Sequence, residues 1–384
     1  MSSRPPPVKS FPDGKVPPYF IPHKRDQVEA FDENVQQLEN INEERFFKLL
    51  DVNDNLLEIP DSPSRLSKDN FCSLVNDIAM AIKEAREHRR LCVYLFLTTP
   101  DFSLDFPDDD LLVFEDTEQK TPNGHVTGTK RRPDIIAAFE KDWMKDRNTE
   151  WGLIRLAGEK ASGGKSLETQ KKNAATYLHY LLLARPDFLV GQGLLITTHA
   201  VTFLVGIGGV GIKQFEVLWK NKKLYKFLYE FIYRLYNPSH FADSSYTRAL
   251  FNKETSEVSY TLRFEEQDYP DLRVIHARNP FATRTHVLSN PFLAQVDDRT
   301  STVFKEQLCQ TGRRFDEWAI LTKIHRPKNV PGVVVAINHE IVETRMPPER
   351  EKHRLGLRQV GSPFTTIPTA KMMLGTLFDL LEGI

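Results

Sequence analysis

The sequence has few cysteines and almost no net charge. Its 384 residues include three cysteines, and the formal net charge at pH 7 is -1. Cys72, Cys92 and Cys309 are far apart in the chain, so they provide neither the ligand spacing of a metal site nor a disulfide framework. This usage predicts a reducing, intracellular compartment, either cytoplasm or nucleus. The balanced charge gives no support for a nucleic-acid partner.

Long apolar runs are also missing, with one exception. The N-terminus has no apolar stretch that would serve as a signal peptide, and residues 1–25 are rich in proline, which predicts a disordered tail. Residues 188–212 carry no Asp, Glu, Lys or Arg, and a segment of that length would span a bilayer. Several polar residues interrupt it, so two buried strands with a turn are predicted and no membrane partner: Gln192, Thr197, Thr198, His199 and Thr202.

The chain is long enough for two domains, and residues 26–250 are predicted to form the first, a mixed α/β domain. Apolar residues recur at helical spacing in residues 67–88, with Ser67 as a candidate N-cap. Residues 26–50 also read as a helix, and residues 91–99 as a strand. The remaining predicted elements are strands at 132–139, 151–159, 188–198, 199–206 and 212–219, and helices at 166–187 and 224–236.

A glycine motif in this domain has the spacing of a dinucleotide-binding turn. Gly206, Gly208 and Gly211 match G-x-G-x-x-G. That turn needs a helix immediately after the glycines, because the pyrophosphate binds at the helix N-terminus. Here "IKQFEVLW" follows, and its residues alternate like those of a strand. The motif therefore predicts a β-hairpin turn and no bound dinucleotide.

A second pattern resembles part of the site of PD-(D/E)XK nucleases. In that fold an Asp lies at the start of one strand, and an acid and a lysine two positions apart lie on the next, where they hold Mg²⁺ and position water. "RPDI" supplies Asp134, "LAGEKAS" supplies Glu159 and Lys160, and the helix that follows supplies Gln170.

The spacing of this set departs from the nuclease pattern. Glu159 and Lys160 are adjacent, so in a regular strand they point to opposite faces. An acid two residues before Lys160 is missing because that position is Gly158, and Ala161 stands two residues after Glu159. The sequence therefore predicts a degenerate, three-layer nuclease-like domain without a metal and without Mg²⁺-dependent DNA cleavage.

Residues 31–384 as a whole resemble the fungal-type protein kinase family, in which a nuclease-like region precedes a divergent kinase domain. The resemblance is carried by "RPDIIAAFEKDW", "WGLIRLAGEKAS", "QKKNAATYLHYLLLARPD", "VFKEQL", "RRFDEWAILTKIH" and "VGSPFTTIPTAKMMLGTLFDLLEGI". It implies a protein-kinase-like small lobe, a five-stranded antiparallel sheet plus one helix, in residues 260–384. It further implies ATP and Mg²⁺ as cofactors and a protein as substrate or partner.

The small lobe contains a lysine and a glutamate at the expected places. "TSTVFKEQL" alternates as a strand in which Lys305 and Val303 share a face, and a helix follows in which Glu317 shares a face with Ile320, Leu321 and Ile324. The resemblance implies a catalytic ion pair between Lys305 and Glu317. It also implies that Val303 and Lys305 contact the nucleotide.

Other kinase elements are missing from the sequence. It has no His-Arg-Asp and no Asp-Phe-Gly, and no glycine occurs between residues 272 and 311, so the loop that covers phosphates is reduced to "NPFATRTHVL". The favoured interpretation is a truncated family member that does not phosphorylate protein Ser or Thr by itself. The alternatives are a degenerate Mg²⁺-dependent nuclease and a non-enzymatic binding module or pseudokinase.

Overall fold

The computed structural model describes most of the chain from residue 38 to residue 358. The described residues are 38–50, 69–96, 110–117, 120–144, 148–161, 164–236, 242–247, 249–252, 257–290, 302–312, 317–326, 334–342 and 350–358, with side chains of residues 88–96 left aside. The predicted tail at residues 1–25, the candidate cap Ser67 and the kinase-like hinge and helix after residue 360 lie outside them.

Seven strands form the first sheet, in the order β1-β7-β6-β5-β4-β3-β2. The pairs β1–β7 and β4–β5 are parallel, and the other neighbours are antiparallel. The strands are β1 (Leu38–Asn40), β2 (Leu112–Asp116), β3 (Ile135–Phe139), β4 (Leu156–Lys160), β5 (Val190–Ile196), β6 (Ala200–Ile207) and β7 (Gly211–Leu218). Two short 3-10 turns, η2 (Glu140–Asp142) and η3 (Trp151–Leu153), lie between β3 and β4.

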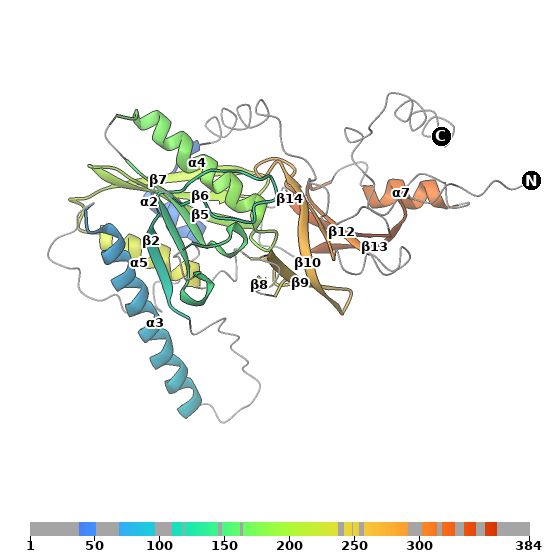
Figure 1. Cartoon of the computed structure of the whole chain (residues 1–384), viewed down its shortest axis with the longest axis horizontal. Helices are drawn as coiled ribbons and strands as arrows, with labels where there is room; N and C mark the ends of the chain where they lie inside the picture. The colour runs from blue at the N-terminus through green and yellow to red at the C-terminus, as the bar shows by residue number, and fades with distance from the viewer. Residues whose placement is uncertain are drawn as a thin grey trace, which may run out of the picture.

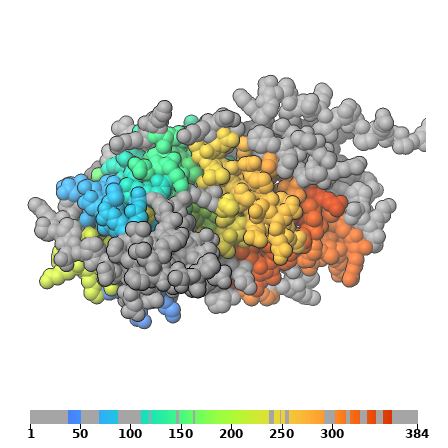
Figure 2. All heavy atoms as spheres, turned by 90° about the horizontal axis from the view of Figure 1, so that it is seen from below, coloured from blue at the N-terminus to red at the C-terminus, as the bar shows by residue number. Residues whose placement is uncertain are grey.

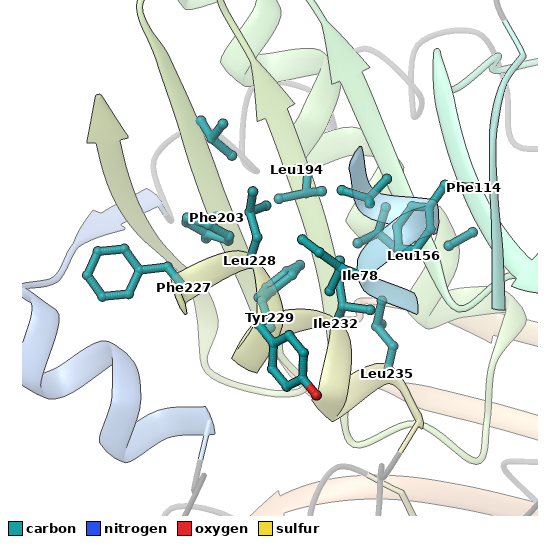
Figure 3. Packing of buried hydrophobic residues seen from close by; sticks show 14 of the residues in the cluster. Ile78, Phe114, Leu156, Leu194, Phe203, Phe227, Leu228, Tyr229, Ile232 and Leu235 are labelled. Atoms are coloured by element: carbon teal, nitrogen blue, oxygen red, sulfur yellow. The ribbon is translucent and has the colours of Figure 1, made fainter. Parts of the chain in front are cut away.

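Helices cover both faces of this sheet and make three layers. On one face lie α2 (Glu43–Leu50), α3 (Phe71–Phe96) and α5 (Leu224–Tyr236), and on the other lies α4 (Leu167–Ala184) (Figure 1). The core under α3 and α5 is built from large apolar side chains such as Ile78, Phe203 and Ile232, none more than 1% exposed (Figure 3). Each such burial contributes about 1.5–3 kcal/mol to folding.

A second sheet of seven strands follows in the chain, and all its pairs are antiparallel. Its order is β13-β14-β12-β11-β10-β9-β8, and α7 (Glu317–His325) packs beside β13. The strands are β8 (Leu250–Asn252), β9 (Glu257–Phe264), β10 (Gln267–Arg278), β11 (Thr285–Ser289), β12 (Val303–Gln310), β13 (Ala336–Val342) and β14 (Arg350–Leu357). The protein is therefore a mixed α/β structure with two sheets.

The β10–β11 turn joins the second sheet to the first. Phe281 packs in the same apolar cluster as α4, and the Gly209 N–H donates a hydrogen bond to the Pro280 carbonyl oxygen at 2.9 Å. The Arg284 guanidinium is buried and donates to the Arg185 carbonyl oxygen at 2.7 Å, at the C-terminal end of α4. Figure 2 shows the yellow-to-gold residues of β9–β11 between the N-terminal layers and the orange strands that follow.

A buried cluster of charged side chains makes a second connection. Asp243, in the segment between the sheets, accepts from Arg354 at 2.7 Å and from Lys352 at 2.5 Å. Arg354 is fully buried, donates to Glu306 at 2.7 Å and also contacts Glu340. Burial opposes the charge on Asp243, but Lys352 and Arg354 nevertheless hold the pKa of its carboxyl below the ordinary value.

The glycine motif forms the predicted hairpin. β6 and β7 are antiparallel with Gly206 opposite Ile212, and Gly209 in the turn has φ +72°, a conformation that glycine adopts without strain. The uncharged segment 188–212 accordingly contains β5 and β6. Among the helices in the described residues, none combines the length and the apolar composition that crossing a bilayer requires.

Two predictions about the N-terminal elements are wrong. A strand was expected at 91–99, but α3 extends to Phe96. No glycine or proline occurs between Ile82 and Phe96, so nothing ends the helix within that segment. In the described part of the helix expected at 26–50, residues 38–40 form β1 and α2 covers Glu43–Leu50, where the Asn42 side chain accepts from the Arg45 N–H at 2.9 Å.

The buried charge cluster yields a prediction about stability. Arg354→Leu removes the shared partner of Asp243, Glu306 and Glu340 and leaves carboxylates in a desolvated site. We expect it to lower the free energy of unfolding by about 3–5 kcal/mol, measured by urea denaturation. Arg263→Leu, on an exposed position of β9, is the matched control and should change it by about 0.5 kcal/mol or less. Equal effects of the two substitutions would contradict the assignment.

Candidate functional site

Asp134 and Glu159 lie on the face of the first sheet that α4 covers. Asp134 immediately precedes β3, and its Oδ2 accepts a hydrogen bond from the Lys160 backbone N–H at 2.9 Å. Glu159, on β4, is fully buried, and its Oε1 accepts from Asn173 of α4 at 2.8 Å. Neighbouring strand pairing therefore brings the two predicted carboxylates together.

Lys160 does not belong to this group. Its Nζ lies 2.9 Å from Asp116 Oδ2, on the opposite face of the sheet from Glu159. This orientation agrees with the expectation that adjacent residues of a strand point apart.

Lys165 supplies a cation that the spacing of the sequence did not reveal. Its Nζ lies 3.3 Å from Glu159 Oε1, and the residue directly precedes Ser166, the N-cap of α4. The Ser166 hydroxyl accepts from the Thr169 backbone N–H at 3.2 Å, which fixes the start of the helix. A lysine therefore approaches Glu159 from the loop before α4, whereas the strand position two residues after Glu159 is Ala161, as the sequence showed.

Gln170 is buried on the inner face of α4. Its side-chain Nε2 donates to the Lys165 carbonyl oxygen at 3.2 Å, so Gln170 supports the loop that holds Lys165. Leu167, the first residue of the helix, is 49% exposed.

Burial raises the pKa values of two side chains in this site, Asp134 and Tyr177. Burial raises the pKa of Asp134 to about 6, the Lys160 N–H opposes that rise, and the charge of Glu159 adds to it. Burial, followed by the charges of Glu159 and Asp134, also raises the pKa of Tyr177, whose hydroxyl donates to the Arg132 carbonyl oxygen at 2.7 Å. These shifts are typical of a site where charge is concentrated away from water.

The donor set of this site fits a hard divalent cation. Glu159 Oε2 is buried and has no hydrogen-bond partner among the described residues. The described residues contain no cluster of three or more His, Cys, Asp or Glu that would enclose a metal. Mg²⁺, however, is commonly held by one or two carboxylates and keeps water as its other ligands. Asp134 and Glu159 are therefore the residues that would hold it.

The second candidate group is the pair Lys305 and Glu317. Lys305 Nζ on β12 forms an ion pair with Glu317 Oε2 at the first residue of α7. The side chains are 25% and 34% exposed, so solvent reaches the pair. The predicted contact between strand and helix is present.

The surroundings of Lys305 differ from the expectation in two respects. Val303 is 1% exposed and packs with Leu321, Leu355 and Leu357, so it is a core residue and does not line an open nucleotide surface. The apolar face expected on α7 is only partly buried: Leu321 is covered, whereas Ile320 and Ile324 are 45% and 37% exposed.

The turn at the position of the phosphate-covering loop packs against the first sheet. Residues 279–284 join β10 to β11 and pack on the first sheet, where Arg284 also approaches Gly208 closely. A turn held in that way does not fold over a ligand near Lys305. The described residues therefore do not fit ATP well.

Comparisons with known proteins give no relative: neither the family models, the curated proteins nor the solved structures contain a match to this chain.

The raised pKa of Asp134 yields a prediction about pH. The pKa of the Asp134 carboxyl is about 6 in the folded protein, compared with an ordinary value of 3.8. Its ionisation therefore lowers the free energy of unfolding fully above about pH 6 and hardly at all below about pH 4. Asp134→Asn should therefore raise the free energy of unfolding by about 1–2 kcal/mol at about pH 8, discounted for partial solvent access, and by little at about pH 4.5. Urea denaturation at both pH values measures this. Asp268→Asn, exposed on β10, serves as the control; a gain that does not depend on pH would refute the assignment.

Proposed function

We propose that the chain is a member of the fungal-type protein kinase family, with a nuclease-like three-layer domain followed by a kinase-like small lobe. The single observation that carries the proposal is the ion pair of Lys305 and Glu317. Counted from β10, Lys305 lies on the third strand, and the helix that bears Glu317 comes next. Protein kinases pair a lysine of the third strand with a glutamate of the following helix in this way.

The activity proposed for these residues is protein binding without phosphate transfer. The family's reaction is ATP-dependent phosphorylation of protein Ser or Thr, which needs a Mg²⁺-binding aspartate and a catalytic aspartate in addition to the lysine. The sequence contains neither His-Arg-Asp nor Asp-Phe-Gly. The buried Val303 and the turn at residues 279–284, which packs on the first sheet, support a lobe that binds nucleotide poorly.

This proposal predicts weak nucleotide binding. An exposed ion pair contributes about 0–1 kcal/mol to stability, so Lys305→Met should leave the melting temperature almost unchanged. ATP with Mg²⁺, titrated by calorimetry, should bind with a Kd on the order of millimolar or not measurably. Lys323→Met, at an exposed position of α7, is the matched control and should leave nucleotide binding unchanged. Micromolar binding that Lys305→Met abolishes would overturn the proposal of a lobe without phosphate transfer.

Lys165 favours a second candidate function, Mg²⁺-dependent hydrolysis of phosphodiesters at Asp134 and Glu159. Bound Mg²⁺ would polarise the phosphate and neutralise developing charge. Lys165 lies 3.3 Å from Glu159 Oε1, so its ammonium is held next to the two carboxylates where an attacking water would have to be oriented. Because Glu159 is fully buried, that ammonium also offsets its charge.

Two lysines of the same region allow a matched test. If the site acts as a nuclease, wild-type protein nicks supercoiled plasmid with Mg²⁺, and Lys165→Met reduces the rate about 100-fold or more. Lys160→Met should retain activity, because Lys160 contacts Asp116 on the opposite face. Absence of nicking by wild type with Mg²⁺ or Mn²⁺, or an equal loss in both variants, would exclude this function. The outcome is independent of nucleotide binding at Lys305.

A further inference from the structure

The face of the second sheet that carries Lys305 also carries two neighbouring histidines. Leu355 of β14 pairs with both Lys305 and His339, and His353 pairs with Ile341, so antiparallel pairing places these side chains on one face. α7 covers this face, and its Trp318 stacks on the His339 ring with centroids 5.8 Å apart.

The two imidazole rings face each other through nitrogen atoms. His339 Nε2 lies 3.0 Å from His353 Nδ1, and the ring centroids are 5.1 Å apart. On its other side, His353 Nε2 lies 3.2 Å from Glu351 Oε2. A carboxylate has only acceptor oxygens, so Glu351 fixes the proton of neutral His353 on Nε2. The lone pair on His353 Nδ1 then accepts a hydrogen bond from His339 Nε2–H, and a metal that binds both nitrogens displaces this proton, so that neutral His339 carries its proton on Nδ1 instead.

We propose that His339 Nε2 and His353 Nδ1 bind a borderline transition-metal ion of the Zn²⁺ or Cu²⁺ class. With Zn–N bonds of about 2.0–2.1 Å, two ligands at the tetrahedral angle are about 3.3 Å apart. The 3.0 Å between these nitrogens needs an adjustment of a few tenths of an ångström. Imidazole selects Zn²⁺, Cu²⁺ and Ni²⁺ over Mg²⁺ and Ca²⁺, so this site is chemically distinct from the carboxylates of the first sheet.

Glu351 acts as a positioning residue in this site. Histidines that bind metal almost always donate their other ring N–H to a carboxylate or carbonyl, which orients the ring and raises its basicity. The Glu351–His353 contact has that arrangement before any metal is bound. The described residues add no third ligand, so water or a ligand donor completes the coordination.

The location gives the metal a structural consequence. β13 is the last strand of its sheet, and the two ligands lie on β13 and on its neighbour β14. A metal bound by both histidines links these two strands on the face that Trp318 of α7 contacts. Because it binds the folded state, it raises the free energy of unfolding. The inference concerns residues other than those of the proposed function and does not rest on it.

Untagged protein treated with a chelator and then titrated with Cu²⁺ or Zn²⁺ tests the site. We expect one equivalent of Zn²⁺ in calorimetry and a Cu²⁺ electron paramagnetic resonance spectrum with coupling to two imidazole nitrogens. His339→Gln and His353→Gln should each remove the stoichiometric binding and reduce the coupling to one nitrogen. Glu351→Gln should weaken Zn²⁺ binding about tenfold while keeping both nitrogens.

His199→Gln is the control for adventitious surface binding, because His199 is exposed in the turn between β5 and β6. This substitution should leave the stoichiometry and affinity of Zn²⁺ binding and the Cu²⁺ spectrum unchanged. Circular dichroism of each metal-free variant checks that the fold is retained. If wild type and both ligand variants bind Zn²⁺ equally, or if Cu²⁺ shows fewer than two nitrogens in wild type, the two histidines form a hydrogen-bonded pair only and the proposal is wrong.

Discussion

Burial of Arg354 against Asp243 and Glu306 is the interaction on which the relation between the two sheets depends. Asp243 lies in the segment that connects the sheets, whereas Arg354 and Glu306 face each other on β14 and β12. Charges removed from water are tolerated only when each has a partner at hydrogen-bond distance. The cluster therefore fixes how the connecting segment sits on the second sheet.

This anchoring places the β10–β11 turn against the first sheet. There Phe281 joins the apolar cluster of α4, and Arg284 and His286 contact the carbonyl oxygens at the end of that helix. The same helix carries Asn173 and follows Lys165, which contact Glu159 near its other end. One helix thus contributes to the first site and to the junction between the sheets, whereas solvent reaches the ion pair of Lys305, whose face of the second sheet carries α7.

Much of the first domain could be predicted from the sequence, because its elements are determined by local patterns. The helix at 224–236, the strands around the glycine hairpin and the position of Asp134 before β3 all follow from periodicity and turn chemistry. The errors fall where local signals are ambiguous. An apolar run at residues 91–96 reads equally well as strand or helix, and only the absence of a stop after Ile82 favours the helix that is observed.

The sequence by itself determined the candidate residues: Asp134 and Glu159 stand on two neighbouring predicted strands, and the resemblance to the kinase family pointed to Lys305 and Glu317. Tertiary structure alone decided which cation reaches Glu159, because Lys160 and Lys165 are both close in sequence and only the packing of α4 on the sheet selects Lys165. It also decided that Val303 is buried and that His339 meets His353. Such contacts join different strands and helices, and their distance depends on strand register and helix packing, which no local pattern encodes.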